Sequence, residues 1–229
     1  MYKNSPVYTG FFFSNERSFG RIVRMMYTFK MKLEDRSWDH KLHISTMGMI
    51  DHMEDEDHFR YEPTPYCVLK RLVESGWITE NSHVVDYGCG KGRVCFFLSD
   101  QTGCQATGVD FSKEMIHFAN QNNLQFLQPD KVRFIWKAAE KYPVEDEDVF
   151  FFFNPFSYDI LRGVLRQILD SWYKNPRKMT LCFYYPSSAY ISTLMQVPEL
   201  MFLDEIDCDD LFVENDSRER ILIFETEDY

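Results

Sequence analysis

The chain has 229 residues, of which 45% are hydrophobic and 17% aromatic, and its formal net charge is −11. This length and apolar content suit one α/β domain with an added segment, and they exclude global disorder. The overall acidity argues against a large nucleic-acid-binding surface.

The apolar residues are not arranged as a membrane segment or a leader. No run of the sequence approaches eighteen apolar residues, and the N-terminus lacks an apolar stretch followed by a cleavage site. We therefore expect a soluble, cytoplasmic protein. The six cysteines are scattered without a CxxC pair, which predicts buried thiols and neither disulfides nor a zinc site.

The first part of the chain predicts one helix and one acidic loop. Residues 15–33 place apolar side chains on a single helical stripe after the N-cap candidate Ser14. This helix either packs on the domain with a solvated basic face or forms a lid for an anionic partner. Residues 51–59, "DHMEDEDHF", match no metal-binding spacing, so we expect a solvated acidic loop and no metal site.

From Pro63 onward, helical and strand patterns alternate. We expect residues 1–60 to form a helical or loop extension and residues 61–229 to form an α/β domain. Its fold should be a doubly wound, mainly parallel seven-stranded sheet with helices on both faces, which binds ligands at the carboxyl ends of its strands. The predicted strands cover residues 83–88, 104–110, 131–136, 148–153, 179–185, 201–208 and 220–226, and the predicted helices cover 65–75, 91–101, 112–122 and 158–172.

A glycine-rich turn, "VVDYGCGKGRV", follows the first predicted strand at residues 84–94. It lacks the GxxxxGK[ST] spacing of a phosphate-binding loop, and its third glycine is misplaced for a dinucleotide fingerprint. What remains is an acidic residue followed by alternating glycines, Asp86-x-Gly88-x-Gly90-x-Gly92. The next strand ends in a second acid, Asp110, which Phe111 follows.

These two strand ends resemble the corresponding motifs of class I S-adenosylmethionine-dependent methyltransferases. The resemblance implies that S-adenosylmethionine is the cofactor, that Asp110 binds both ribose hydroxyls and that Phe111 flanks the adenine. A carboxylate can accept both hydrogen bonds of a vicinal diol. The alternative is a tight turn in a fold without this ligand. The cofactor-binding residues that we expect are Tyr66, Asp86, Gly88, Gly90, Asp110, Phe111, Ala139, Glu140 and Asn154.

The fourth predicted strand ends in "FFFNPFS", residues 151–157. This stretch resembles the Asn-Pro-Pro-Tyr/Phe motif of enzymes that methylate planar nitrogens, although it has one proline where the motif has two. The resemblance implies catalytic roles for Asn154, Pro155 and Phe156, with the Asn oxygen accepting a hydrogen bond from the target nitrogen. The alternative is a strand-ending turn before a helix.

The segment "RYEPTPY", residues 60–66, precedes the first helix of the domain. It resembles a Tyr-x-Pro-Thr-Pro segment of some seven-strand protein-lysine methyltransferases, which implies that Tyr61, Glu62 and Thr64 contact the substrate. The two prolines could equally stiffen an entry loop.

The expected function is therefore methyl transfer from S-adenosylmethionine to a nitrogen acceptor, with a protein side chain favoured. An RNA or DNA base, or a small molecule, is the alternative acceptor. Two other interpretations are a non-catalytic cofactor-binding module and a nicotinamide-dependent oxidoreductase, which the glycine spacing disfavours.

Overall fold

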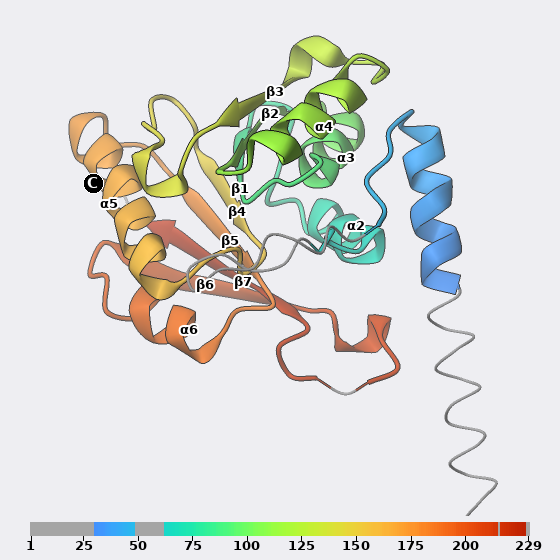
Figure 1. The fold of residues 1–229 in the computed structure, drawn as a ribbon. Helices are drawn as coiled ribbons and strands as arrows, with labels where there is room; N and C mark the ends of the chain where they lie inside the picture. The colour runs from blue at the N-terminus through green and yellow to red at the C-terminus, as the bar shows by residue number, and fades with distance from the viewer. Residues whose placement is uncertain (1–29, 49–61, 215, 228–229) are drawn as a thin grey trace, which may run out of the picture.

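Seven strands form a single sheet in the computed structural model, which describes residues 30–48, 62–214 and 216–227 (Figure 1). Their spatial order is β3-β2-β1-β4-β5-β7-β6. The strands are β1 (His83–Tyr87), β2 (Gln105–Asp110), β3 (Val132–Trp136), β4 (Val149–Phe152), β5 (Thr180–Tyr184), β6 (Leu200–Asp207) and β7 (Arg220–Thr226).

The sheet is mainly parallel, as expected, but it is mixed because its last strand runs antiparallel to its neighbours. Strands β1 to β5 pair in parallel, but β7 lies antiparallel to both β5 and β6. The regular structure described in the connection from β6 to β7, which includes residue 215 outside the described ranges, is the short 3-10 turn η3 (Asp209–Leu211). A parallel return needs a crossover, usually a helix, so this short connection brings β7 back antiparallel beside β6.

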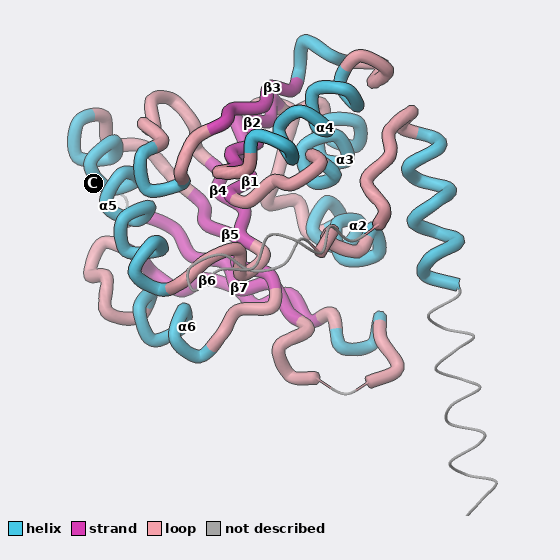
Figure 2. The backbone as a smooth tube through the Cα atoms, in the orientation of Figure 1, coloured by secondary structure: helices cyan, strands magenta, loops and turns pink. Residues whose placement is uncertain are grey.

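Helices cover both faces of the sheet, as the alternating sequence pattern predicts (Figures 1 and 2). One core packs α2 and α3 against one face, and a second packs α5 and α6 against the other. In β4, Phe151 belongs to the first core, while Phe150 and Phe152 belong to the second. This burial on both faces explains the continuous apolar run of a central strand. The helices are α2 (Tyr66–Glu74), α3 (Arg93–Thr102), α4 (Lys113–Asn123), α5 (Tyr158–Lys174) and α6 (Ser188–Leu194), and two further 3-10 turns are η1 (Pro129–Lys131) and η2 (Ala139–Lys141).

An N-terminal helix over residues 30–41 lies beside α2 and α3 (Figure 1). Its Trp38 ring stacks on Tyr66 at a centroid distance of 5.9 Å and meets Phe97 edge-on at 4.9 Å. The predicted amphipathic helix over residues 15–33 lies outside the described residues up to residue 29. The acidic stretch 51–59 lies outside them entirely.

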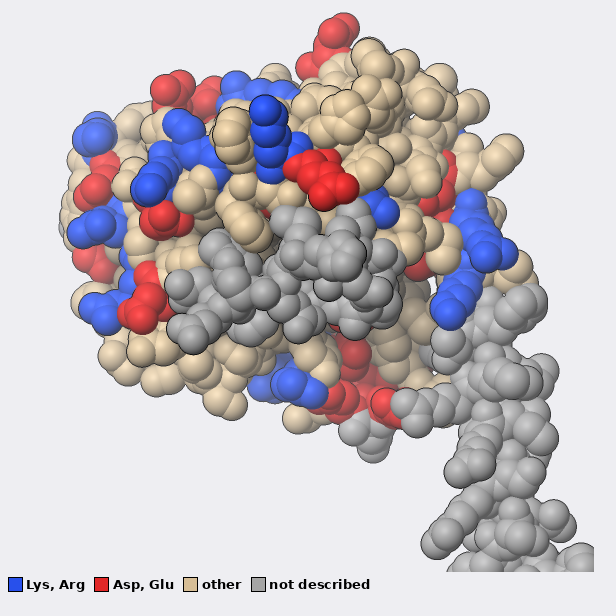
Figure 3. All heavy atoms as spheres, viewed as in Figure 1, with Lys and Arg blue, Asp and Glu red and all other residues tan. Residues whose placement is uncertain are grey.

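Charge is distributed unevenly over the surface. On the face that Figure 3 shows, acidic side chains gather near the connection between β6 and β7, and basic side chains are frequent over α5. None of the helices in the described part of the chain combines the length and apolar character that a membrane crossing requires.

Candidate active site

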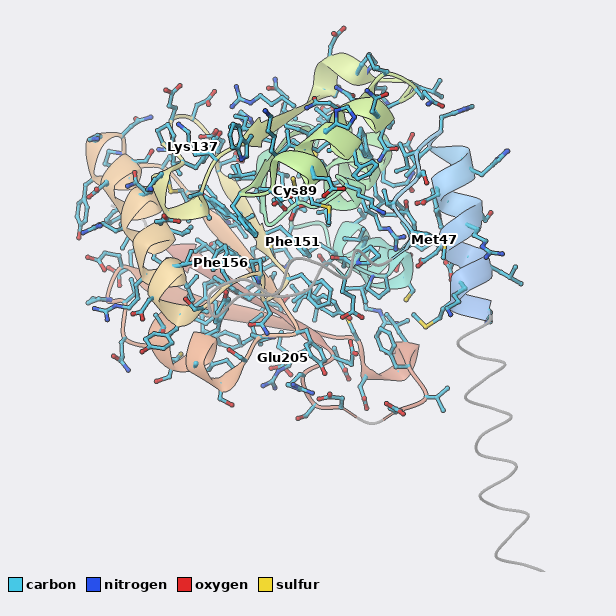
Figure 4. The ribbon with its side chains drawn as sticks, viewed as in Figure 1. Met47, Cys89, Lys137, Phe151, Phe156 and Glu205 are labelled. Atoms are coloured by element: carbon cyan, nitrogen blue, oxygen red, sulfur yellow. The ribbon has the colours of Figure 1, made fainter. Side chains whose placement is uncertain are left out.

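A cavity of about 350 Å³ opens at the carboxyl ends of the central strands. Its walls come from the turns after β1, β2, β4 and β5, from residues 62–65 and from the start of α3. Figure 4 labels Cys89 and Phe156, which line it from the glycine turn and from the segment after β4. The cavity lies where the doubly wound topology predicts a ligand, and its volume is in the range of small-molecule sites.

The glycine turn brings backbone directly to the cavity wall. Gly88, Gly90 and Gly92 all have left-handed backbones, with φ angles of 78°, 51° and 89°. A Cβ atom on Gly88 would lie 2.5 Å from the Cβ of Pro155, so no larger residue fits there without a shift. The backbone N–H of Gly88 donates to the carbonyl of Val109 at 2.8 Å and anchors the turn to the end of β2. The turn is therefore a cradle that permits close backbone approach by a ligand.

Asp110 holds a fixed carboxylate at the end of β2. It is 7% exposed, and its two oxygens accept hydrogen bonds from the backbone N–H groups of Gly90 at 2.9 Å and Ser112 at 2.8 Å. These bonds set the orientation of the carboxylate at the cavity wall. The neighbouring Phe111 ring is partly exposed and also lines the cavity.

Asp86 is a second, more deeply buried carboxyl group in the same wall. Burial and, secondarily, the negative charge of Asp110 raise the pKa of Asp86 to about 8. At neutral pH this carboxyl is therefore mostly protonated in the free protein. A cation bound nearby would favour its ionised form, so the pair of acids suits a positively charged ligand.

The segment after β4 presents an unpaired acceptor. Asn154 has a left-handed backbone, with φ of 43°, and its side-chain Oδ1 is buried without a hydrogen-bond partner among the described residues. Such an oxygen is costly unless a ligand pairs with it. The next two residues fix the segment, because Pro155 packs against Gly88 and the Phe156 carbonyl accepts a hydrogen bond from Tyr190 at 2.7 Å.

The cavity has two sides, separated by the end of β4. On one side, which we call the glycine side, lie Asp86, Gly88, Asp110 and Phe111, at the ends of β1 and β2. On the other, the aromatic side, lie Phe153, Tyr184, Tyr185 and Phe212. In the sheet, β1 and β2 lie on one flank of β4, whereas β5 and β7 lie on its other flank. The residues of the two sides are therefore kept apart by β4.

Arg93, at the start of α3, supports the wall from behind. It is 2% exposed, and its guanidinium donates to Thr46 Oγ1 at 2.7 Å, Asp35 at 3.0 Å and the Thr64 carbonyl at 3.2 Å. Sequence reasoning missed this residue. The sequence signal that could have identified Arg93 is its position directly after the glycine turn. Because this turn lacks the spacing of a phosphate-binding loop, a basic residue there suggests a structural partner.

Tyr66 lies behind the cavity and not in its wall. It is fully buried, its hydroxyl donates to Asp39 at 2.7 Å, and its ring lies 4.5 Å from the Arg93 guanidinium carbon. Asp39 also accepts from Thr46, whose backbone N–H and hydroxyl donate at 2.6 and 2.7 Å. This polar cluster joins the N-terminal helix to the domain that carries the cavity.

The structure brings most of the remaining predicted residues together. Gly90 is outside the cavity lining and acts through its bond to Asp110, and Glu140 packs against Gly163 of α5. Tyr61 lies outside the described residues. The predicted residues that line the cavity are Glu62, Thr64, Asp86, Gly88, Asp110, Phe111, Ala139, Asn154, Pro155 and Phe156, and the main ones that sequence reasoning missed are Arg93, Phe153, Tyr184, Tyr185, Phe212 and Glu219.

A cluster of possible metal ligands occurs at the opposite end of β1 within the described ranges. It consists of His83, Asp146 and Glu147. Glu147 already accepts hydrogen bonds from Tyr142 and Arg133, and a guanidinium this close disfavours a bound cation. This cluster is separate from the cavity.

Comparison with known proteins agrees with this geometry. Residues 78–178 match a family model described as a methyltransferase domain. A protein-lysine N-methyltransferase from Saccharolobus islandicus is 35% identical over 66 residues, which cover 28% of this chain and 41% of that protein. The chain spans less than half the length of the curated relatives it matches.

Solved structures show the same fold at low sequence identity. An RNA methyltransferase from Salinibacter ruber in complex with S-adenosyl-L-homocysteine aligns with a TM-score of 0.51 at 14% identity, over 73% of this chain and 95% of its own. A TehB-like S-adenosylmethionine-dependent methyltransferase from Corynebacterium glutamicum aligns with a TM-score of 0.50 at 17% identity, over 70% and 88%. By its strand order, its glycine turn and the methyltransferase-domain model that residues 78–178 match, the chain is similar to the class I, Rossmann-like S-adenosylmethionine-dependent methyltransferases and shares their fold.

Proposed function

We propose that this chain transfers a methyl group from S-adenosylmethionine to a nitrogen acceptor, with a protein side chain as the favoured acceptor. The observation that carries the proposal is the buried Oδ1 of Asn154, which has no hydrogen-bond partner within residues 30–48, 62–214 and 216–227 and lies between the glycine side and the aromatic side. An acceptor N–H can pair with this oxygen at the junction of the two sides.

The residues of the glycine side fit the cofactor. The Gly88 cradle accepts close backbone approach, and the carboxylate of Asp110 can receive both ribose hydroxyls. The acidic pair Asp86 and Asp110 suits a ligand with a positive sulfonium. When bound, the cofactor supplies an electrophilic methyl group.

The chain's own contribution is positioning. In the proposed mechanism, Asn154 accepts a hydrogen bond from the acceptor nitrogen and points the nitrogen lone pair toward the methyl group. The Phe156 backbone, held by Tyr190, fixes this segment. Methyl transfer depends mainly on such alignment, because a well-oriented pair of reactants avoids most of the entropic cost of meeting.

The test has a binding step and a transfer step. Isothermal titration should detect both S-adenosylmethionine and S-adenosylhomocysteine, and labelled methyl from the former should then enter the protein pool of a fractionated extract. Asn154→Ala should retain cofactor binding and lose transfer, whereas the exposed Asn81→Ala, in the loop before β1, serves as the control.

Each contrary result has a distinct meaning. Absence of binding by the folded protein would overturn the proposal. Binding without transfer to any pool would favour a non-catalytic module. Label in the RNA or small-molecule pool would show that the acceptor is an RNA base or a small molecule and not a protein side chain.

A further inference from the structure

The aromatic side of the cavity is a built wall of rings. Phe153 lies 4.7 Å from Tyr184 and 6.4 Å from Tyr185, between ring centroids, and it meets Tyr185 at 90°. Tyr184 is 2% exposed, and Phe212 completes this wall of the cavity. Four rings from three separate segments therefore border the space beyond Asn154.

Two carboxyl groups stand among these rings. Glu219 accepts a hydrogen bond from the Tyr184 hydroxyl at 2.6 Å, and Glu62 also lines the cavity. Burial is the main cause that raises the pKa of Glu219, and the charges of Asp216 and Glu62 add to it. Glu219 is thus a carboxylate with increased affinity for a proton.

The nearby guanidinium groups are already engaged with other acids. Arg218 forms an ion pair with Asp216 at 2.6 Å, and Arg93 pairs with Asp35 at 3.0 Å. Asp216 in turn accepts from the Tyr185 hydroxyl at 2.6 Å. The charge that the aromatic side offers to a ligand is therefore negative.

Backbone strain coincides with this side. Of the three non-glycine residues with positive φ in the described ranges, Asn154 at 43° and Tyr185 at 52° follow the adjacent strands β4 and β5 and line the cavity. A left-handed backbone is strained for a tyrosine, and such strained residues cluster at binding and catalytic sites. Both residues border the same cavity.

We propose that the aromatic side holds the acceptor as a primary alkyl ammonium group, of the kind a lysine side chain carries. This inference rests on the proposed methyl transfer and specifies its substrate. Aromatic faces attract an ammonium ion, and Glu62 and Glu219 neutralise its charge. A planar amide or a nucleobase brings no positive charge to offset these two carboxylates.

The chemistry balances with these groups. The ammonium ion first gives one proton to the Glu219 carboxylate, which leaves a neutral amine. Asn154 Oδ1 then accepts a hydrogen bond from one of the two remaining N–H groups. The amine lone pair forms the new N–C bond as the methyl–sulfur bond breaks, and that electron pair stays on sulfur, which becomes a neutral thioether. The product is a methylammonium ion, and Glu219 returns its proton to solvent.

Product analysis tests the substrate class. The probe is a soluble protein pool from a cell extract, used as prepared and after acetylation of its lysines. We expect labelled methyl only in the untreated pool, recovered as methyl-lysine after acid hydrolysis. Label that survives lysine acetylation, or that is released as methylamine from an amide, would overturn the inference. Failure to label the untreated pool while S-adenosylhomocysteine binds would also count against it.

A matched pair of variants tests the site. Glu219→Gln should lower kcat/KM for the untreated pool by about tenfold or more, since a charge-assisted contact and a proton acceptor are removed. Its affinity for S-adenosylhomocysteine should not change. Glu74→Gln, at the exposed end of α2, should leave both quantities unchanged. If the parent protein does not bind S-adenosylhomocysteine, the proposed function itself is wrong. If Glu219→Gln leaves kcat/KM unchanged, only the proposed amine site is wrong.

Discussion

The two sides of the cavity are built in different ways. The glycine side is made largely of backbone from two consecutive strand ends, where Gly88 and Asp110 are tied through hydrogen bonds to Val109 and Gly90. The aromatic side is made of side chains at the end of β5 and in the segments that directly follow β4, β5 and η3. The glycine side, where we propose that the methyl donor binds, is therefore encoded locally, while the aromatic side, proposed for the acceptor, depends on distant segments meeting in the fold.

Backbone conformation divides the two sides in the same way. The glycine side reaches left-handed φ angles with glycine, at little steric cost. The aromatic side reaches them with Asn154 and Tyr185, where the surrounding structure must hold the strain. The paired strands β4 and β5 provide the rigid frame that holds this strain.

The largest expected effect removes the glycine side's carboxylate. Asp110→Ala should weaken S-adenosylhomocysteine binding by at least about 100-fold, because charge-assisted hydrogen bonds are lost together with the anchor of Gly90. Isothermal titration measures this, with the exposed Asp130→Ala as control. Unchanged affinity would show that the ribose does not bind here.

Asn154→Gly should separate methyl transfer from cofactor binding. Glycine keeps the left-handed backbone and removes the amide, so we expect methyl transfer to fall by about 30-fold while S-adenosylhomocysteine affinity stays within about twofold. Single-turnover kinetics and titration give the two numbers. Equal loss of both would mean that Asn154 belongs to the cofactor site.

Gly88→Ala should disturb the cradle, and the chain offers a matched control in Gly76→Ala. Both glycines have φ near 79°, at 78° and 79°, but a Cβ on Gly76 would meet nothing within 4 Å, whereas one on Gly88 would strike Pro155. We expect Gly76→Ala to lower the free energy of unfolding by about 1 kcal/mol and Gly88→Ala by about 2–3 kcal/mol. Urea denaturation checks this, and equal values would mean that Pro155 yields without cost.

The smallest effect concerns pH. Because the pKa of Asp86 is about 8 in the free protein, a bound cation must displace a proton from it at lower pH. Affinity for S-adenosylmethionine should therefore rise from pH 6 toward pH 8 and level off above it, by less than about tenfold in total. In Asp86→Asn, affinity for S-adenosylmethionine should no longer depend on pH over this range. A titration series in matched buffers measures it, and a pH dependence that persists in the variant would show that another group is responsible.

The same contrast explains what the sequence could predict. Gly88 and Asp110 were identifiable because their spacing is local. All seven strands were located, since their apolar runs are distinct, but periodicity carries no information on the direction of β7. Tyr66 was expected at the cofactor, yet it pairs with Asp39, a partner from a segment with no recognisable motif. Tyr184 and Tyr185 could not be identified as cavity residues from the sequence, because an aromatic residue at the end of a strand cannot be told from a core residue by pattern alone.

Lys91, within the glycine turn, links the binding site to the order in which the chain folds. Its ammonium donates to the Met47 carbonyl at 3.0 Å across 44 positions, and Asn122 pairs with Ser45 across 77 positions. Long loops close at a greater entropic cost than the short β1–β2 connection. We expect the sheet to form first and the segment around Ser45 to dock last, so the donor site would be completed only in the final stage of folding. Hydrogen exchange during refolding should then protect the α3 amides before the Ser45 amide.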